Sequence, residues 1–223
     1  MPDVEALVVD FGGVLTTSMA ESFTEFVRSE DVDGEHLHRV LFADYGEGTL
    51  VHGVETGRVT MEEFERELAT KLRTTSGDPV AAEGLVARMF AGARANGPML
   101  DAVRRARAAG FRTGLLSNSW GNRDSYAFEH FDTLFDAVVI SGEVGMRKPD
   151  PEIYALAARE VGVPPGRCVF VDDIGANVRG AVAAGMIGVH HRQTDTTLEE
   201  LEALLGIALR GERGPGPERG SRD

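Results

Sequence analysis

The sequence of 223 residues contains a single cysteine, so no disulfide can form within the chain. It is also short of positive charge: 23 lysines and arginines face 36 aspartates and glutamates, a formal net charge of -13. That balance disfavours nucleic acid, whose binding depends on clustered lysine and arginine. No apolar run approaches the roughly 20 residues of a membrane helix, and the start lacks the segments of a signal peptide. We expect a cytoplasmic monomer or homodimer that binds neither nucleic acid nor membrane.

Five short apolar or β-branched runs are present, and helical patterns separate the last four of them. The runs cover residues 4–10, 112–117, 137–141, 169–172 and 187–190. Each of the three clearest helical patterns in this half ends in a glycine, a common way to terminate a helix. Buried strands that alternate with helices predict an α/β fold, a doubly wound Rossmann-like parallel sheet.

The segment between the first and second runs has no strand-like stretch over about 80 residues and shows successive amphipathic helical patterns. The clearest helix, over residues 60–73, begins with Thr60 as its cap and Glu63 as the acid of a capping box. The end of the chain alternates Gly, Pro, Arg and Glu without apolar residues. We therefore predict a catalytic core from 1–16 and 97–208, an inserted helical domain over 17–96, and a disordered tail over 209–223.

Polar groups stand where the predicted strands end or shortly afterwards. In chain order they are Asp10, Ser117 with Asn118, Lys148, and Asp172 with Asp173. The carboxyl ends of parallel strands converge on one crevice, so we expect these side chains to meet there. Carboxylates from two strands suit Mg²⁺, while Asp10 suits attack on phosphorus, and a hydroxyl, glycine-turn amides and a lysine suit phosphate oxygens. The pattern predicts a phosphoryl-transfer site.

The motifs at these positions resemble those of a known family. Asp10-Phe-Gly-Gly-Val-Leu, Ser117-Asn118, Lys148-Pro149 and Asp172-Asp173 are similar to the four ordered motifs of the haloacid dehalogenase superfamily, and the inserted helices resemble its small helical cap. The stretches 117–120, 144–149 and 172–177 further resemble the N-terminal phosphatase domain of soluble epoxide hydrolase and its bacterial relatives.

The resemblance implies a Mg²⁺-dependent hydrolase, most simply a phosphatase of a small phosphorylated metabolite. Asp10 would be both nucleophile and metal ligand, and the backbone carbonyl of residue 12 and Asp173 would complete the protein ligands. Ser117 and Lys148 would bind phosphate and assist catalysis. Gly13 and Asn118 would also contact substrate, and Asp172 and Asn177 would support the site.

Position 12 departs from the family pattern, because phosphatases of this kind usually carry there an aspartate that acts as general acid and base. Gly12 has no proton to donate, and general acid–base help is typically worth about 10² to 10⁴ in rate. Four outcomes stay open. The protein is a phosphatase for esters with activated leaving groups such as anomeric phosphates, a residue of the cap replaces the missing acid, or water transfers the proton directly. The fourth is a protein that binds phosphorylated ligands without turnover. A 2-haloacid dehalogenase is a further alternative.

Simpler interpretations exist for several of these residues. Asp172 and Asp173 suit the cap of a following helix, Lys148 suits a solvated loop, and Trp120 suits a core or crevice wall. A receiver-type phosphorylation switch shares the residue types, but there the acid pair precedes the phosphorylated aspartate, and no helical domain is needed. In the inserted segment, four polar residues suit either substrate contact or solvated helix ends: Glu47, His52, Glu55 and Arg58.

Overall fold

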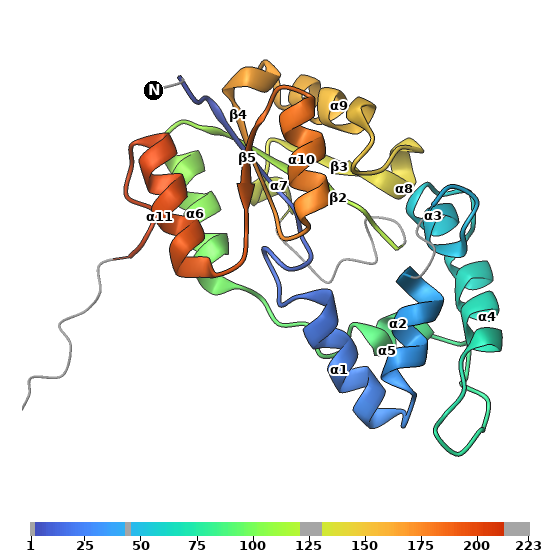
Figure 1. Cartoon of the computed structure of the whole chain (residues 1–223). Helices are drawn as coiled ribbons and strands as arrows, with labels where there is room; N and C mark the ends of the chain where they lie inside the picture. Colours follow the sequence, from blue (N-terminus) through green and yellow to red (C-terminus); the bar gives the residue numbers. More distant parts are fainter. Residues whose placement is uncertain (1–2, 43–45, 121–130, 212–223) are drawn as a thin grey trace, which may run out of the picture.

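The computed structural model describes residues 3–42, 46–120 and 131–211. Its centre is one parallel sheet in the order β3-β2-β1-β4-β5 (Figure 1). The strands are β1 (Ala6–Val9), β2 (Arg112–Ser117), β3 (Ala137–Ile140), β4 (Cys168–Asp172) and β5 (Ile187–His190). The predicted doubly wound α/β fold is confirmed, and the direction of winding reverses beside β1.

Helices cover both faces of the sheet. One face packs against α6 (Gly97–Ala108) and α11 (Thr194–Leu205), and the other packs against α9 (Pro151–Val161) and α10 (Gly175–Ala183) (Figure 1). Short helices α7 (Phe131–Leu134), α8 (Ser141–Val144) and η2 (Pro165–Arg167) lie in the connections. Because side chains alternate along a strand, Leu7 and Val9 enter the first layer, whereas Ala6 and Val8 enter the second. Both faces of β1 are therefore buried.

Five helices between β1 and β2 form a separate hydrophobic cluster, here called the helical insertion. They are α1 (Met19–Ser29), α2 (Gly34–Phe42), α3 (Leu50–Glu55), α4 (Met61–Lys71) and α5 (Leu85–Met89). In α4, Thr60 and Glu63 make the predicted capping box, and Phe64 and Leu68 are fully buried. Trp120, which follows β2, packs into this cluster from the sheet side.

Two neighbouring backbone segments tie the insertion to the sheet. The N–H of Thr17 donates to the carbonyl of Arg94 at 2.8 Å, and the N–H of Asn96 donates to the carbonyl of Leu15 at 2.8 Å. The Asn96 side-chain amide also donates to the carbonyl of Val14 at 3.0 Å. The entry and exit of the insertion therefore lie side by side, next to the loop that follows β1.

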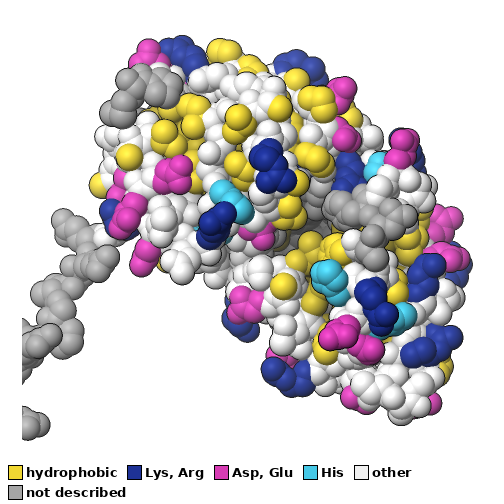
Figure 2. Space-filling view, viewed as in Figure 1, with side chains coloured by type: hydrophobic (Ala, Val, Ile, Leu, Met, Phe, Trp, Pro, Cys, Tyr) yellow, Lys and Arg dark blue, Asp and Glu magenta, His cyan; other side chains and the backbone are white. Residues whose placement is uncertain are grey.

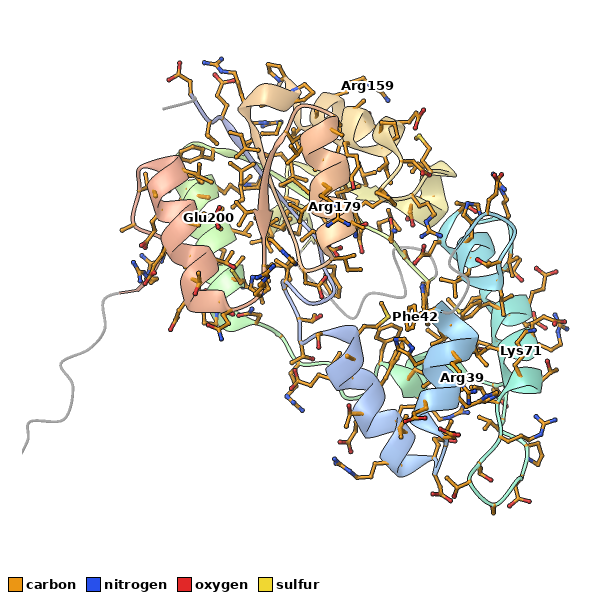
Figure 3. All side chains as sticks on the ribbon, viewed as in Figure 1. Arg39, Phe42, Lys71, Arg159, Arg179 and Glu200 are labelled. Carbon is orange, nitrogen blue, oxygen red and sulfur yellow. The ribbon has the colours of Figure 1, made fainter. Side chains whose placement is uncertain are left out.

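The outer surface is charged, and exposed side chains such as Arg159, Lys71 and Arg39 lie on the outer sides of their helices (Figure 3). Among the described residues, no helix is both long enough and apolar enough to cross a membrane. Near the end of α11, Glu202 accepts hydrogen bonds from the N–H groups of Leu209 and Arg210, and Leu209 is buried in the core. The packed structure thus extends beyond the boundary predicted at 208, and residues 212–223 lie outside the described part.

Candidate active site

A buried lysine lies between two carboxylates at the carboxyl edge of the sheet. Asp10 follows β1, and Asp172 ends the neighbouring strand β4, so the register of this strand pair places the two acids together. Nζ of Lys148 is 2.9 Å from Oδ1 of Asp10 and 2.6 Å from Oδ2 of Asp172, and it also donates to the carbonyl of Leu116 at 3.1 Å. The Lys148 side chain is completely buried. All three predicted residues therefore meet in one cluster.

Asp173 joins this cluster through a close approach that requires glycine on the opposite side. Asp10, Asp172 and Asp173 each offer a carboxylate oxygen, and these oxygens lie within 4.8 Å of one another. Gly13, in the loop after β1, has a φ of +74°, and a Cβ there would overlap with the Asp173 carboxylate. A side chain at position 13 would thus be strained and would displace Asp173.

Asn177 and Asn118 orient the charged residues of the cluster. The Asn177 side-chain amide donates to both carboxylate oxygens of Asp172 at 3.1 Å, and the Ile174 N–H donates to Oδ1 of Asp172 at 2.8 Å. Asn118 holds the backbone of Lys148 twice: its Oδ1 accepts from the Lys148 N–H at 2.8 Å, and its Nδ2 donates to the Lys148 carbonyl at 3.0 Å. Both functional atoms of Asn118 contact Lys148, while its predicted contact with substrate stays a prediction.

The loop after β1 fixes the orientation of Asp10. The Phe11 N–H donates to Oδ1 of Asp10 at 2.7 Å, and the Gly13 N–H donates to the Thr17 carbonyl at 3.3 Å. Gly12 is exposed, and a Cβ there would meet nothing within 4 Å. The Gly13 amide is therefore engaged within the loop, and the predicted roles of Gly12 and Gly13 toward metal and phosphate stay predictions.

The cluster is short of positive charge. Three carboxylates surround one ammonium group, which gives a formal charge of -2 when all are ionised. Burial raises the pKa of Asp10 to about 8 and that of Asp173 to about 6, and Asp172 adds to both shifts. Burial alone would lower the pKa of Lys148, but Asp10 and Asp172 raise it, so the ammonium form persists. A hard divalent cation with oxygen ligands fits this site in charge and in chemistry.

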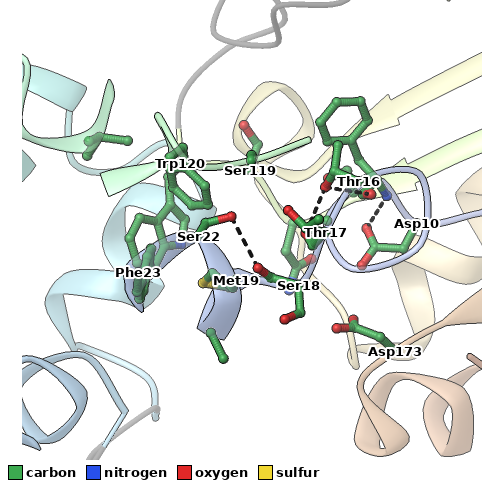
Figure 4. A pocket seen from close by; sticks show the side chains of 18 of the residues that line it. Asp10, Thr16, Thr17, Ser18, Met19, Ser22, Phe23, Ser119, Trp120 and Asp173 are labelled. Carbon is green, nitrogen blue, oxygen red and sulfur yellow. Dashed lines mark hydrogen bonds between the residues drawn. The ribbon is translucent and has the colours of Figure 1, made fainter. Parts of the chain in front are cut away.

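A cavity of about 980 Å³ leads from this cluster into the helical insertion. Its polar end contains Asp10, Ser117, Lys148 and Asp173. Its far end is lined mainly by apolar side chains, namely Met19, Phe23, Val27, Leu37, Phe42, Met61, Val86, Phe90 and Trp120. Figure 4 shows Asp10 and Asp173 on one side of the space and Phe23 and Trp120 on the other, and Figure 2 shows hydrophobic side chains around the hollow between sheet and insertion. The cluster of carboxylates and lysine therefore opens onto an apolar chamber.

Two buried charges near the cluster had not been predicted to interact. Glu55, at the end of α3, is only 2% exposed, and its Oε2 is 3.1 Å from Nη1 of Arg147. Its Oε1 accepts a hydrogen bond from Nε1 of Trp120 at 3.2 Å. The sequence suggested either substrate contact or a solvated helix end for Glu55. Because the side chain is buried, the second interpretation is wrong. No local pattern signals this contact, because the partners are far apart in the chain.

Comparisons with known proteins agree with this fold. The family model of haloacid dehalogenase-like hydrolases matches residues 4–185. Bifunctional epoxide hydrolase 2 of Sus scrofa is 32% identical over an alignment of 226 residues, gaps included. The alignment covers 92% of this chain and 40% of that protein. Glyceraldehyde 3-phosphate phosphatase of Methanopyrus kandleri is 36% identical over 101 residues, 43% of this chain and 42% of that protein. The chain thus matches less than half the length of each of these two relatives.

A solved structure supports the fold. The crystal structure of a HAD family enzyme from Bacteroides thetaiotaomicron, in complex with magnesium and inorganic phosphate, matches with a TM-score of 0.63 at 20% identity. The match covers 85% of this chain and 94% of that one, and at this identity it concerns the fold alone. With the family model spanning most of the sequence, the chain belongs to the haloacid dehalogenase-like hydrolases.

Proposed function

We propose that this protein is a Mg²⁺-dependent phosphatase that hydrolyses phosphomonoesters through an aspartyl-phosphate on Asp10. The observation that carries the proposal is the cluster of three carboxylates, two of them buried, and one buried lysine at the polar end of the cavity. Asp10 and Asp173, with the backbone carbonyl of Gly12, would hold the metal. When bound, Mg²⁺ supplies positive charge that lets a phosphate dianion approach the carboxylates.

The protein residues divide the reaction between them. A carboxylate oxygen of Asp10 attacks phosphorus, and the bond from phosphorus to the alcohol oxygen breaks with its electron pair on that oxygen. Because Gly12 carries no acid, the departing oxygen takes its proton from water. Ser117 and Lys148, both buried at the polar end of the cavity, bind the phosphate oxygens and offset their charge. A water molecule then attacks phosphorus and gives up a proton to solvent, the bond from phosphorus to Asp10 breaks with its electron pair on the carboxylate, and phosphate leaves.

The chamber supports a substrate whose alcohol part is large and apolar. Phe23, Phe90 and Trp120 contact one another with ring centroids 5.4 to 6.0 Å apart, which gives the chamber an aromatic wall. Apolar walls stabilise an apolar ligand by removing its surface from water, at about 25 cal/mol per Å². The archaeal relative is named for a small polar phosphate, but its match covers only 43% of this chain. We therefore assign the chamber to the alcohol part of the ester.

The test compares octyl phosphate with ethyl phosphate, two primary alkyl esters with the same leaving-group chemistry. We expect phosphate release in Mg²⁺ and none in EDTA, with activity restored by added Mg²⁺. Each buried methylene contributes about 0.8 kcal/mol, so kcat/KM for octyl phosphate should exceed that for ethyl phosphate by at least about 10²-fold.

Three results would contradict parts of this proposal. If the protein bound octyl phosphate but hydrolysed neither it nor the more reactive acetyl phosphate, it would be a ligand-binding relative rather than a phosphatase. Halide release from 2-haloacids with no phosphate release would indicate a dehalogenase. Equal kcat/KM for the two alkyl phosphates would leave the phosphatase in place but remove the apolar substrate class.

The missing acid at position 12 leads to a separate prediction. Gly12 lies outside the left-handed region and has open space around its Cβ direction, so Gly12→Asp fits without strain. A carboxyl there can protonate a poor alkoxide leaving group, and we expect kcat for octyl phosphate to rise by about 10²-fold. The kcat for p-nitrophenyl phosphate, whose leaving group needs no proton, should change less than about threefold.

The matched control for this substitution is Gly12→Asn, which has nearly the same shape but cannot supply a proton. We expect no rise in kcat with octyl phosphate for this variant. Equal gains from Asp and Asn would show that the effect is steric. No gain from Asp would show that proton transfer to the leaving group is handled by another group.

A further inference from the structure

A buried ion pair joins the helical insertion to the segment that carries Lys148. Glu55 ends α3 of the insertion, and Arg147 immediately precedes Lys148 on the sheet side. Their side chains are 3% and 5% exposed, and the charged atoms lie 3.1 Å apart. Nε of Arg147 also donates to the carbonyl of Lys148 at 3.3 Å. Glu55 of the insertion is thus paired with the residue that directly precedes Lys148 in the chain.

The same carboxylate also contacts the loop after β2. Trp120 donates to Oε1 of Glu55 at 3.2 Å, and Trp120 follows closely on Asn118, which holds the backbone of Lys148 through two hydrogen bonds. The segment of Lys148 is therefore held from two directions: by Asn118 within the sheet body and by Arg147 through Glu55.

A close backbone approach docks α3 at this place. Gly57, just after α3, has a φ of +67°, and a Cβ there would overlap with the backbone carbonyl oxygen of Gly142 in α8. Only glycine permits this contact at that φ. The end of α3 therefore lies directly on the short helix that leads to Arg147.

Burial makes this contact sensitive to docking. An unpaired charge in a dry environment is costly, so Glu55 and Arg147 stay together while α3 is docked and must both be hydrated if it moves away. We propose that Glu55 is a positioning residue that acts through Arg147 to hold Lys148 between Asp10 and Asp172 while α3 is docked. The predicted effect on kcat rests on the proposed phosphatase function, whereas the predicted effects on hydrogen exchange and on Trp120 emission do not.

The test uses Glu55→Gln, Arg147→Met and the double variant of the full chain. The matched control is Glu62→Gln, which removes the same charge from an exposed pair in the insertion, where Glu62 lies 3.9 Å from Arg66. Hydrogen exchange is followed in peptides from residues 141–149, and emission is read from Trp120, the single tryptophan of the chain. Kinetics are measured with p-nitrophenyl phosphate and Mg²⁺.

We expect Glu55→Gln and Arg147→Met each to speed exchange at 141–149 by at least tenfold and to shift the emission of Trp120. Each should lower kcat by at least tenfold with less than a threefold change in KM, and the double variant should be no worse than the more damaged single variant. The control should match wild type in every measurement. Glutamine keeps the shape of Glu55, so this variant decides the proposal even where Arg147→Met does not fold.

Two results would overturn the proposal. One is a folded Glu55→Gln protein with wild-type exchange at 141–149 and, where the wild type turns over, wild-type kcat. The other is equal changes in Glu62→Gln, which would show an effect of net charge alone. A wild-type protein without phosphatase activity would refute the proposed function, and exchange together with Trp120 emission would still decide the role of Glu55.

Discussion

Replacement of Asp10 by asparagine is expected to lower kcat for octyl phosphate by at least about 10³-fold, because asparagine cannot form the covalent intermediate. The fold should persist. Burial raises the pKa of Asp10 to about 8, so the ionised side chain is disfavoured in the folded, metal-free protein, and a neutral amide of the same shape should not lower Tm. Phosphate release measures the first effect, and thermal unfolding in EDTA measures the second.

The control for this variant is Asp150→Asn, which removes an exposed acid two residues beyond Lys148. It should keep wild-type kcat and Tm. In the wild type, acid quenching during turnover followed by peptide mass analysis should find phosphate on the peptide that contains Asp10, and the Asp10→Asn protein should show none. Turnover that survives the substitution would mean that Asp10 is not the nucleophile.

The sheet was predictable because its central strands β1 and β4 are buried along their whole length and are therefore mainly apolar runs. The runs predicted at 112–117 and 187–190 coincide with β2 and β5, and the run at 4–10 contains β1. The meeting of Asp10 with Asp172 follows from the same logic, since β1 and β4 are parallel neighbours and their ends share an edge. Topology alone brings these side chains together, although their chemical roles stay predictions.

The contacts of Glu55, Arg147 and Trp120 were beyond the sequence for a physical reason. They come from three segments whose meeting depends on how α3 docks on α8, and that docking depends on a close approach at Gly57 rather than on any periodic pattern. The burial of Leu209 was hard to predict because the residues that follow it are polar. A single glutamate in α11 accepts the hydrogen bond that holds its backbone. Local sequence patterns predict helices and strands, whereas contacts between distant segments depend on how the surfaces of those helices and strands pack.

Lys148→Met is expected to have the largest effect on stability. Methionine fills a similar volume but removes the ammonium between Asp10 and Asp172, so the cluster loses the positive charge that lies against both acids. Breaking a buried ion pair typically costs about 3–5 kcal/mol, which corresponds to a fall in Tm of about 6–20 °C for a chain of this size. The kcat should fall by at least about 10³-fold. Lys71→Met, an exposed lysine in α4, is the control and should change neither value.

A second substitution separates the two roles of Lys148. In the Lys148→Met background, Asp172→Asn removes one uncompensated carboxylate and should restore several degrees of Tm, whereas kcat should stay low because no cation faces the phosphate. Added Mg²⁺ should likewise raise the Tm of Lys148→Met more than that of wild type, since the metal offsets the same charge. If kcat recovered together with Tm, Lys148 would be a structural residue and phosphate charge would be offset elsewhere. If Tm recovered in neither case, repulsion among the carboxylates would not be the cause of the instability.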